Sequence, residues 1–541
     1  MKNLQADAAI IGGGLGGVAA ALALLQKGYQ VVLTEEYAWL GGQATSQGVP
    51  PDEHVHIEEL GNPSYLEWRN RIRDYYRRNY PLTERAKNNP FLNPGGGTVS
   101  ALCHEPKVGA TVLEEMLTQY ASFGQLTILR EAVPIAVETE GRILRSVTVQ
   151  QADGTTVITA PYIVDATELG DLLPLSGTEY VTGSESKEDT GEDHAIDVAD
   201  PLDMQSITWC FAMSRGEPDE NHVIEKPARY EHYKQHLSEF WPGSQLSWDY
   251  VHPITLETTP SGIDGDPETR DLWRYRKILT REHFPERLAF DEVTLVNWPQ
   301  NDYWFGSIIE VDDETRERHL EEAREISLCW FYWLQTEAPR RDGGTGYPEL
   351  RLRGDVLGTD DGFAMAPYIR EARRIKPLYR ITEKDVGYRM RKRLYDARAI
   401  EKLAAPQYED SVGIGYYRID LHPSTAGRNY IDILSLPFEI PLGALIPQDK
   451  DNLLAANKNI GTTHITNGCY RLHPVEWNIG EAVGHLIAYC IRHESTPAEV
   501  RENSFKLQHY QQGLERAGIK LHWPEHLREG WTPYEDPEFD D

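Results

Sequence analysis

The apolar positions at the start of the chain follow two different patterns, one typical of a strand and one typical of a helix. Residues 7–11 end in a short aliphatic run, which is typical of a buried strand in a parallel sheet. Residues 18–27 are rich in Ala and Leu over a helical length, Gly28 follows as a helix-ending glycine, and residues 30–33 begin a second apolar run. This order predicts a strand, a helix and a second parallel strand within the first 35 residues.

Further apolar runs extend the pattern over most of the chain. The predicted strands are 126–129, 132–137, 143–150, 155–159, 162–165, 412–422, 441–447 and 452–456, and the predicted helices are 65–80, 107–120, 312–333 and one from about 475. The strand at 412–422 would place Tyr416, Arg418 and Asp420 on one face. Residues 183–203 are polar and acidic, which predicts a surface loop or a domain boundary.

A glycine motif lies between the first strand and the first helix. Gly12, Gly14 and Gly17 form G-x-G-x-x-G, in which the glycines allow a tight turn, close approach of a pyrophosphate and close packing of helix on strand. Glu35 ends the second strand, eighteen residues after Gly17, where a carboxylate accepts hydrogen bonds from a ribose diol. The sequence therefore predicts a dinucleotide site, and this unit leaves FAD and NAD open.

A second glycine pair favours FAD. Gly41 and Gly42 are followed by Gln43, Thr45 and Ser46, which suits a loop that continues along the cofactor toward an isoalloxazine edge. An NAD-binding unit has no particular use for such a loop. Ala166 and Thr167 follow the strand at 162–165 in a small-residue turn. This turn resembles the Ala-Thr-Gly-type turn of two-dinucleotide-binding-domain flavoproteins, which implies that it returns to the cofactor.

The net charge and the cysteine content of the chain limit the kinds of partner that it is expected to bind. The chain has 541 residues, a formal net charge of −31, and five scattered cysteines without a C-x-x-C pair. The charge argues against nucleic acid and anionic membranes, and the cysteines indicate a reducing cytoplasm without a disulfide framework or thiolate zinc site. No apolar run has membrane-spanning length, and a strand from residue 7 leaves no room for a signal peptide. His54 and His56 lack a third ligand at a conventional spacing, so no metal site is expected.

Motifs at both ends of the chain carry a family resemblance. They are Leu40-Gly-Gly42, Asn452-Leu-Leu-Ala-Ala456, Thr463-His464, Gly468, Arg471 and Gly480-Glu-Ala-Val-Gly484. With them the chain resembles the FAD-dependent oxidoreductase family of the glutathione-reductase-like flavoprotein superfamily, and more distantly the succinate dehydrogenase and fumarate reductase flavoproteins. The resemblance covers nearly the full length.

The resemblance implies an α/β fold with a discontinuous, Rossmann-like FAD-binding domain and an inserted mixed α/β substrate domain. The expected divisions are 1–183 and 431–500 for the FAD-binding domain, 184–430 for the insertion, and 501–541 for a C-terminal helix and acidic tail. The expected contacts to non-covalently bound FAD are Gly12, Gly14, Leu15, Gly16, Gly17, Glu35, Glu36, Gly41, Gly42, Gln43, Thr45, Ser46, Val133 (through its backbone), Ala166, Thr167, Asn478 and Ile479. Two departures stand out: Glu168 replaces a usual glycine, and Asn457-Lys458 stands where relatives often have Gly-Arg.

The cofactor sets the expected reaction. We expect an FAD-dependent oxidase or dehydrogenase that removes a hydride from a C–H next to O or N of a small polar substrate, while a side chain takes the proton. The candidates for that proton are His464, then His473, then His422. Arg471 and Arg418 are candidates to hold a carboxylate, and Tyr416 or Tyr470 to contact a substrate oxygen. The electron acceptor, oxygen or another, and the oligomeric state stay open.

Three alternatives remain at this point. A reductase of an activated C=C bond in an unsaturated acid would use the same parts with an arginine as acid, for which the basic stretch Arg370–Arg374 is the best feature. A flavin monooxygenase needs a reductant site that is not evident in the sequence. A non-catalytic dinucleotide-binding module is the third.

Overall fold

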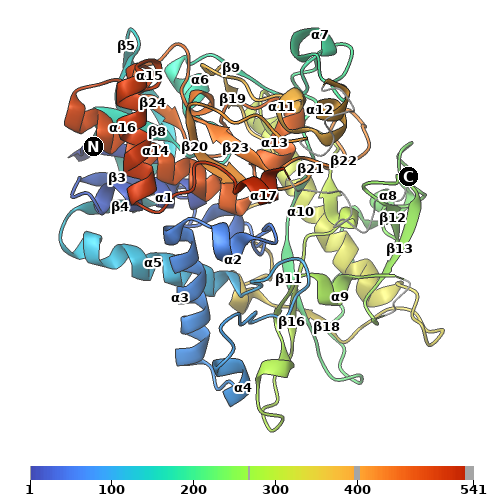
Figure 1. The fold of residues 1–541 in the computed structure, drawn as a ribbon. Helices are drawn as coiled ribbons and strands as arrows, with labels where there is room; N and C mark the ends of the chain where they lie inside the picture. The colour runs from blue at the N-terminus through green and yellow to red at the C-terminus, as the bar shows by residue number, and fades with distance from the viewer. Residues whose placement is uncertain (1, 266–268, 395–402, 530–541) are drawn as a thin grey trace.

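A five-stranded parallel sheet supports the N-terminal part of the fold. The computed structural model (Figure 1) describes residues 2–265, 269–394 and 403–529. Its strands lie in the order β24 (Leu453–Ala455), β8 (Tyr162–Asp165), β2 (Ala8–Ile11), β3 (Val31–Glu35) and β4 (Leu126–Arg130). All four residues of β2 are buried, as expected for the central strand of a sheet that is covered on both faces. β24 comes from far along the chain and completes a sheet that begins at residue 8.

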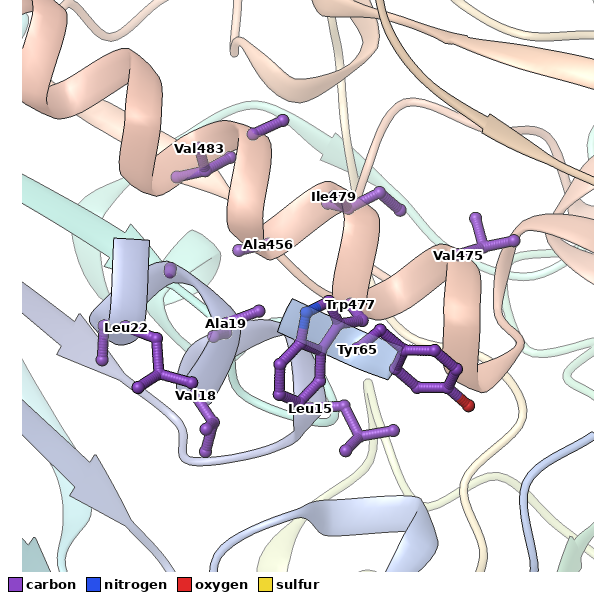
Figure 2. Packing of buried hydrophobic residues seen from close by; sticks show 14 of the residues in the cluster. Leu15, Val18, Ala19, Leu22, Tyr65, Ala456, Val475, Trp477, Ile479 and Val483 are labelled. Atoms are coloured by element: carbon purple, nitrogen blue, oxygen red, sulfur yellow. The ribbon is translucent and has the colours of Figure 1, made fainter. Parts of the chain in front are cut away.

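Two parallel helices pack together against this sheet. α1 (Leu15–Leu25) follows β2, and α14 (His473–His493) lies beside it along most of its length. A Cβ at Gly480 would lie 1.9 Å from the Gly16 carbonyl oxygen, and one at Gly484 would lie 2.4 Å from the Ala20 oxygen. Figure 2 shows Val475, Ile479 and Val483 of α14 in the same apolar cluster as residues of α1. The glycines therefore let the two helices approach, and both N-termini lie at the same end.

The strands predicted between 126 and 165 are confirmed, with small shifts at their ends. β5 (Val133–Glu140), β6 (Ile143–Gln151) and β7 (Gly154–Thr159) form an antiparallel meander to which β1 (Lys2–Gln5) adds in parallel. The predicted helices are also present, as α3 (Pro63–Asn79), α5 (Pro106–Ser122) and α10 (Asp313–Thr336). The fold is thus mixed α/β with a Rossmann-like parallel sheet, as predicted. The four-part division of the chain stays a prediction.

The middle of the chain has a hydrophobic core of its own. A sheet in the order β15 (Lys277–Leu279), β16 (Val293–Val296), β11 (Phe211–Arg215) and β18 (Leu350–Leu352) lies near α10 (Figure 1). Phe331 of α10 packs edge-on against Phe211, with ring centroids 5.5 Å apart, and Trp330 stacks on Trp333 at 4.9 Å. The aromatic richness of this stretch is therefore largely a matter of packing.

Three expectations about local structure were wrong. The strand predicted at 412–422 is split into β20 (Ser411–Gly415), which pairs with β23 (Phe438–Pro441), and β21 (Ile419–Leu421), which pairs with β22 (Ile431–Ile433). Tyr416 and Arg418 therefore do not share one continuous strand face with Asp420. The strand predicted at 441–447 ends at Pro441, and residues 442–445 form a 3₁₀ turn.

The third concerns the acidic stretch 183–203, which is not a plain surface loop. The alternative that it marks a domain boundary stays a prediction. It contains α7 (Lys187–Thr190), and the side chains of Ser184, Glu185, Glu192 and Asp203 are buried. Arg374 and Arg428 pair with two of these acids, which explains how acidic residues are accommodated inside the fold.

The C-terminal part begins with α15 (Pro497–Glu502) and α16 (Ser504–Arg516). The end of the predicted acidic tail, residues 530–541, lies outside the described residues. Within the described ranges, no helix has both the length and the apolar character needed to cross a bilayer.

Candidate functional site

The glycine turn forms a groove at the carboxyl edge of the parallel sheet. Gly12 has a φ of +107°, and a Cβ there would lie 2.1 Å from the Ala166 carbonyl oxygen. A Cβ at Gly17 would lie 2.0 Å from the Gly12 oxygen. The groove is lined by Gly12, Gly13, Gly14, Glu35, Glu36, Ala166, Thr167 and their neighbours. These glycines are required by close backbone contact, so the turn can take the shape that a dinucleotide needs.

Glu35 faces this groove from the end of β3. Its Oε2 accepts the Gly13 N–H at 3.0 Å and its Oε1 accepts the Tyr37 N–H at 3.0 Å. Burial raises the pKa of Glu35 to about 8. Ala132 and Pro134 line the same groove, whereas the Val133 side chain is 43% exposed. The contact that the family resemblance implies for the Val133 backbone stays a prediction.

The N-terminus of α1 already binds a carboxylate. Its N-cap is Gly14, which has no side chain to cap the helix. The Gly16 N–H donates to Oε1 of Glu476 at 3.0 Å, although Glu476 belongs to the first turn of α14. A helix N-terminus attracts negative charge in this way. The same position suits the diphosphate of FAD, so the residues fit the cofactor that the sequence predicts.

The loop that follows β3 joins the glycine turn to α14. Gly41 has a φ of +109°, and its N–H donates to the Gly13 oxygen at 2.8 Å. The Gln43 amide donates to the Arg471 carbonyl oxygen at 3.1 Å and also to Glu476. Its Oε1 is buried without a hydrogen-bond partner. The Thr45 and Ser46 hydroxyls donate to carbonyls of the same loop, so they hold its shape.

A polar cavity of about 140 Å³ opens next to this loop, between the middle of the chain and the residues before α14. Its acidic and basic lining residues are Arg270, Arg276, Arg370, Arg418, Arg471, Asp52, Asp420, Asp432, His252 and His422. Tyr275, Tyr368, Tyr417 and Tyr430 also line it. Arginines outnumber the carboxylates, so the cavity favours an anionic or strongly polar occupant.

Several buried polar atoms of this lining have no hydrogen-bond partner among the residues that the structure describes. They are Asp52 Oδ1, Arg276 Nε, Arg370 Nε, Arg471 Nε, Trp298 Nε1 and Tyr430 OH. Buried polar groups are normally paired because leaving one unpaired costs about 1–3 kcal/mol. Their concentration around one cavity indicates that a polar ligand completes it.

Two of the predicted catalytic residues line this cavity. Arg471 donates from Nη1 to the Tyr368 hydroxyl at 2.9 Å and pairs through Nη2 with Asp420 Oδ2 at 3.1 Å. Arg418 pairs with Asp432 at 2.5 Å. His422, the third of the predicted proton acceptors, also lines the cavity.

The other predicted catalytic residues lie elsewhere. His464 contacts Glu371 Oε1 at 2.9 Å inside a buried cluster with Arg374. Both ring nitrogens of His473 are engaged, since Nδ1 accepts the Asp52 N–H at 3.1 Å and Nε2 lies 3.3 Å from the Val49 oxygen. Burial holds the pKa of His473 well below its ordinary value. The Tyr470 hydroxyl donates to the Glu439 oxygen at 2.8 Å, and Tyr416 is not part of the cavity lining.

The two expected flavin contacts on α14 have structural partners. The Asn478 amide donates to the Ile414 carbonyl oxygen at 2.8 Å, and Ile479 is fully buried in the cluster of Figure 2. The residues nearer the N-terminus of α14, Arg471 to Glu476, contact the loop and the cavity instead.

Several functional candidates were not identified from the sequence. Asp52, Arg270, Arg276, Asp302 and Tyr368 come from four separate segments, and none belongs to a recognisable motif. Apart from Asp302, which lies behind His422, they line the cavity directly.

One comparison with known proteins identifies a family over most of the chain. The model of a family described as FAD dependent oxidoreductase matches residues 7–514. A search of curated proteins finds no match.

Solved structures with some likeness include L-proline dehydrogenase from P. horikoshii (21% identity, 34% of this chain and 24% of that chain, TM-score 0.18). They also include quinol fumarate reductase from E. coli (13% identity, 95% of this chain and 74% of that chain, TM-score 0.33). A third is a geranylgeranyl bacteriochlorophyll reductase-like protein from Thermoplasma acidophilum (10% identity, 95% of this chain and 84% of that chain, TM-score 0.33). The matched parts span less than half the length of the proline dehydrogenase, of the aromatic hydroxylase CabE and of AlpK. Since every TM-score is below 0.5, these likenesses carry no argument about activity.

Proposed function

The chain belongs to the FAD-dependent oxidoreductase family, and from that premise we propose that it transfers a hydride between FAD and a small polar organic substrate bound in the arginine-lined cavity. When bound, FAD supplies a hydride acceptor or donor at N5. The protein's part is to bind and orient the substrate, to stabilise charge and to move the coupled proton. The alternative of a non-catalytic dinucleotide-binding module is excluded because the members of this family are enzymes.

The observation that carries this proposal is a continuous set of contacts from the glycine turn to the cavity. The Gly16 N–H binds Glu476, Glu476 binds the Gln43 amide, and that amide binds the Arg471 carbonyl. Arg471 then lines the cavity. A dinucleotide with its diphosphate at the turn would lie along this line, so its reactive end would reach the cavity.

The size and chemistry of the cavity support a small polar substrate. A volume of 140 Å³ is below the roughly 300–1,000 Å³ of pockets for drug-sized ligands. Its charged lining and unpaired polar atoms exclude an apolar occupant on energetic grounds.

The proposal includes the two-part organisation of the chain. Most cavity residues come from the proposed insertion at 184–430, while Asp52, Asp432 and Arg471 come from the flanking parts. The proposed FAD contacts are the glycine turn, Glu35, Glu36, the loop 41–46, Ala166 and Thr167, together with the Val133 backbone and the first turns of α14.

Reduction of an activated C=C bond in an unsaturated acid is a second candidate. Arg370, the first residue of the basic stretch, lines the cavity and is nearly fully buried. This reaction would run in the opposite direction, from reduced flavin to substrate. It predicts that unsaturated acids reoxidise the dithionite-reduced protein without oxygen.

Spectroscopy of the purified protein tests the proposed function. We expect a flavin spectrum after purification or reconstitution with FAD, and loss of the visible flavin absorbance when a substrate is added without oxygen. Arg471→Met should retain FAD and lose substrate-dependent reduction, whereas Arg145→Met, an exposed residue on β6, should behave as wild type. Absence of FAD binding would overturn the proposal, as would full substrate reduction in the Arg471 variant.

A further inference from the structure

We propose that the substrate of this cavity is a small hydroxycarboxylate, whose carboxylate binds Arg270 and Arg276 and whose hydroxyl proton passes to Nε2 of His422, with Asp302 as the residue that positions the ring. This inference rests on the proposed function, because it needs the flavin as hydride acceptor. It adds a substrate class, a proton acceptor and a positioning residue.

The His422 ring is held in one orientation by a buried carboxylate. Its Nδ1 lies 2.6 Å from Oδ2 of Asp302, whose side chain is inaccessible to solvent. This contact places the ring proton on Nδ1 and leaves the Nε2 lone pair available. Nε2 has no hydrogen bond within the described part of the chain, and Asp420 Oδ2 lies 3.8 Å away from it. His422 lines the cavity, so Nε2 is the nitrogen that a substrate can reach.

Asp302 is itself fixed by neighbours that occupy its other oxygen. Oδ1 accepts hydrogen bonds from the Thr208 hydroxyl and, at 3.2 Å, from Nη2 of Arg370. Burial opposes its ionisation, but the charge of Arg370 and the hydrogen bond with His422 hold the pKa of Asp302 below its ordinary value. The carboxylate therefore stays ionised and aims Oδ2 at the imidazole, as the acid does in a His–Asp pair.

The imidazole is available as a base near neutral pH. The charged and titratable groups around it are Asp302, Asp420, Arg370 and Tyr430. Burial and the charge of Arg370 together hold the pKa of His422 below its ordinary value, although both aspartates oppose this effect. A neutral imidazole can accept the proton of a hydroxyl group as a C–H bond is broken.

The carboxylate specificity follows from how the arginines are paired. Arg370, Arg418 and Arg471 each have a carboxylate partner, in Asp302, Asp432 and Asp420 respectively. Arg270 has none among the described residues. Its guanidinium lies 4.4 Å from the Tyr275 ring centroid and 5.3 Å from that of Trp298, so it is held by aromatic faces.

Arg276 is only loosely paired. Its nearest carboxylate oxygen, Asp52 Oδ1, lies 3.9 Å away, and its Nε has no hydrogen-bond partner. Burial raises the pKa of Asp52 above its ordinary value despite this arginine, which weakens the pair further. Arg270 and Arg276 are thus the cations that a substrate carboxylate would neutralise, and an arginine binds a carboxylate through two parallel hydrogen bonds.

The same charges select a hydroxyl over an amine at the reacting carbon. An amino acid would bring an ammonium group into a cavity where Arg370, Arg418 and Arg471 are each paired with a carboxylate. The positive charge that is left over, on Arg270 and Arg276, would repel that group. A hydroxyl group brings no charge. The substrate class is therefore a hydroxy acid.

The half-reaction balances with these groups. The C–H bond breaks and its electron pair leaves with the hydrogen as hydride to the flavin. The O–H bond breaks and its proton goes to Nε2 of His422. A C=O bond forms, so the product is a ketocarboxylate, and the two electrons are on the reduced flavin.

The test is anaerobic flavin reduction with matched substrates. The FAD-loaded protein is mixed with a panel of small 2-hydroxy acids, with the corresponding 2-amino acids, and with the amides of the hydroxy acids. We expect reduction by at least one hydroxy acid, and rates lower by at least about tenfold for its amide and amine analogues. Reduction by an amine or a neutral alcohol but by no hydroxy acid would overturn the substrate class and leave the proposed function standing.

Variants separate the roles of the residues. His422→Asn should slow reduction by about 10²–10⁴-fold and abolish the acidic limb of the pH–rate profile. Asp302→Asn should slow reduction and move that limb to lower pH, since the anion that favours the imidazolium is gone. Arg270→Met should raise the KM for the hydroxy acid by at least about tenfold with a smaller change in kcat, and Arg270→Lys should restore part of the loss.

His509→Asn, a substitution on α16 outside the cavity, is the matched control and should leave the rates unchanged. The FAD content of each variant is measured first, which separates a folding defect from a chemical one. A His422→Asn variant that keeps FAD and the wild-type pH profile would overturn the proton role. An unshifted limb in Asp302→Asn would overturn the positioning role.

Discussion

Nζ of Lys458 lies 2.5 Å from Oε2 of Glu168, in an ion pair packed against the glycine turn. Lys458 is inaccessible to solvent, and it also lies 3.8 Å from Oε2 of Glu476. The other oxygen of Glu168 would lie 2.5 Å from a Cβ at Gly42 and 2.9 Å from one at Gly14. The carboxylate thus covers the two glycines over which the diphosphate of FAD is expected to pass. Both residues stand at positions where the family resemblance implies other residue types.

The first prediction concerns this pair. Glu168→Gln should tighten FAD binding by about tenfold, roughly 1.4 kcal/mol, because a carboxylate no longer faces the diphosphate. Lys458→Met should weaken binding by at least as much, since it leaves Glu168 and Glu476 without their cation. The measurement is the Kd for FAD, from quenching of flavin fluorescence by the apoprotein. Lys520→Met, an exposed substitution, is the control, and weaker binding in Glu168→Gln would contradict the account.

The second prediction is a pH dependence of cofactor binding. Burial raises the pKa of Glu476 to about 7. Below this value Glu476 is neutral, and above it Glu476 is an anion at the N-terminus of α1, where the diphosphate is expected. FAD affinity should therefore fall as the pH rises from about 6 to about 8. Glu476→Gln should flatten this profile, and affinity that increases with pH would be inconsistent with it.

The third prediction tests the contact between α1 and α14. Gly480→Ala should destabilise the protein by about 1–3 kcal/mol, because its Cβ would lie 1.9 Å from the Gly16 oxygen. Gly513→Ala on α16 is the matched control, since its Cβ would have only one neighbour, the Arg516 side chain at 4.0 Å. That control should gain about 0.5–1 kcal/mol of stability. Chemical denaturation measures both, and equal stabilities would show that the helices are less closely packed than described.

The fourth prediction concerns the buried cluster around His464. Arg374 donates to the Gly183 oxygen at 2.7 Å, pairs with Glu185 Oε1 at 3.1 Å and also contacts Glu371. Arg374→Met would leave two buried carboxylates short of a cation and should cost about 3–5 kcal/mol in the free energy of unfolding. Arg353→Met, which removes a partly exposed pair with Asp355 (the Asp355 side chain is 54% exposed), should cost less than about 1 kcal/mol. A wild-type denaturation curve for Arg374→Met would refute this role.

The glycine turn was predictable because its motif is local. The spacing of Gly12, Gly14 and Gly17 between a strand and a helix identifies all three within one strand–helix–strand unit. Only Gly17 has its closest contact inside that unit, with Gly12, whereas Gly12 lies against Ala166 and Gly14 against Glu168. The small residues of α14 were also identified, but their partner is α1, as the contact between Gly480 and Gly16 shows. The spacing of small residues predicts that another element packs closely there, but it does not identify that element as α1.

The cavity was not predictable in the same way. Asp52, Arg270 and Asp302 meet His422 through tertiary packing across several hundred residues, and no local pattern marks these three. His422 was predicted only as the third candidate proton acceptor. His464 was chosen because it belongs to a motif, but its ring is held by Glu371 outside the cavity. His473 belongs to the same segment, and both of its ring nitrogens have backbone partners. Whether each histidine faces the cavity depends on the direction of its side chain, which the sequence pattern does not give.

The central claim is that FAD, anchored at the glycine turn, meets its substrate in the cavity lined by Arg471 and His422. A crystal structure of the FAD-loaded protein with a non-reacting carboxylate tests this most directly. The account predicts the diphosphate at the N-terminus of α1, the isoalloxazine ring at the cavity beside Arg471, and the carboxylate on Arg270. An isoalloxazine ring that points away from this cavity, with the carboxylate bound elsewhere, would contradict it.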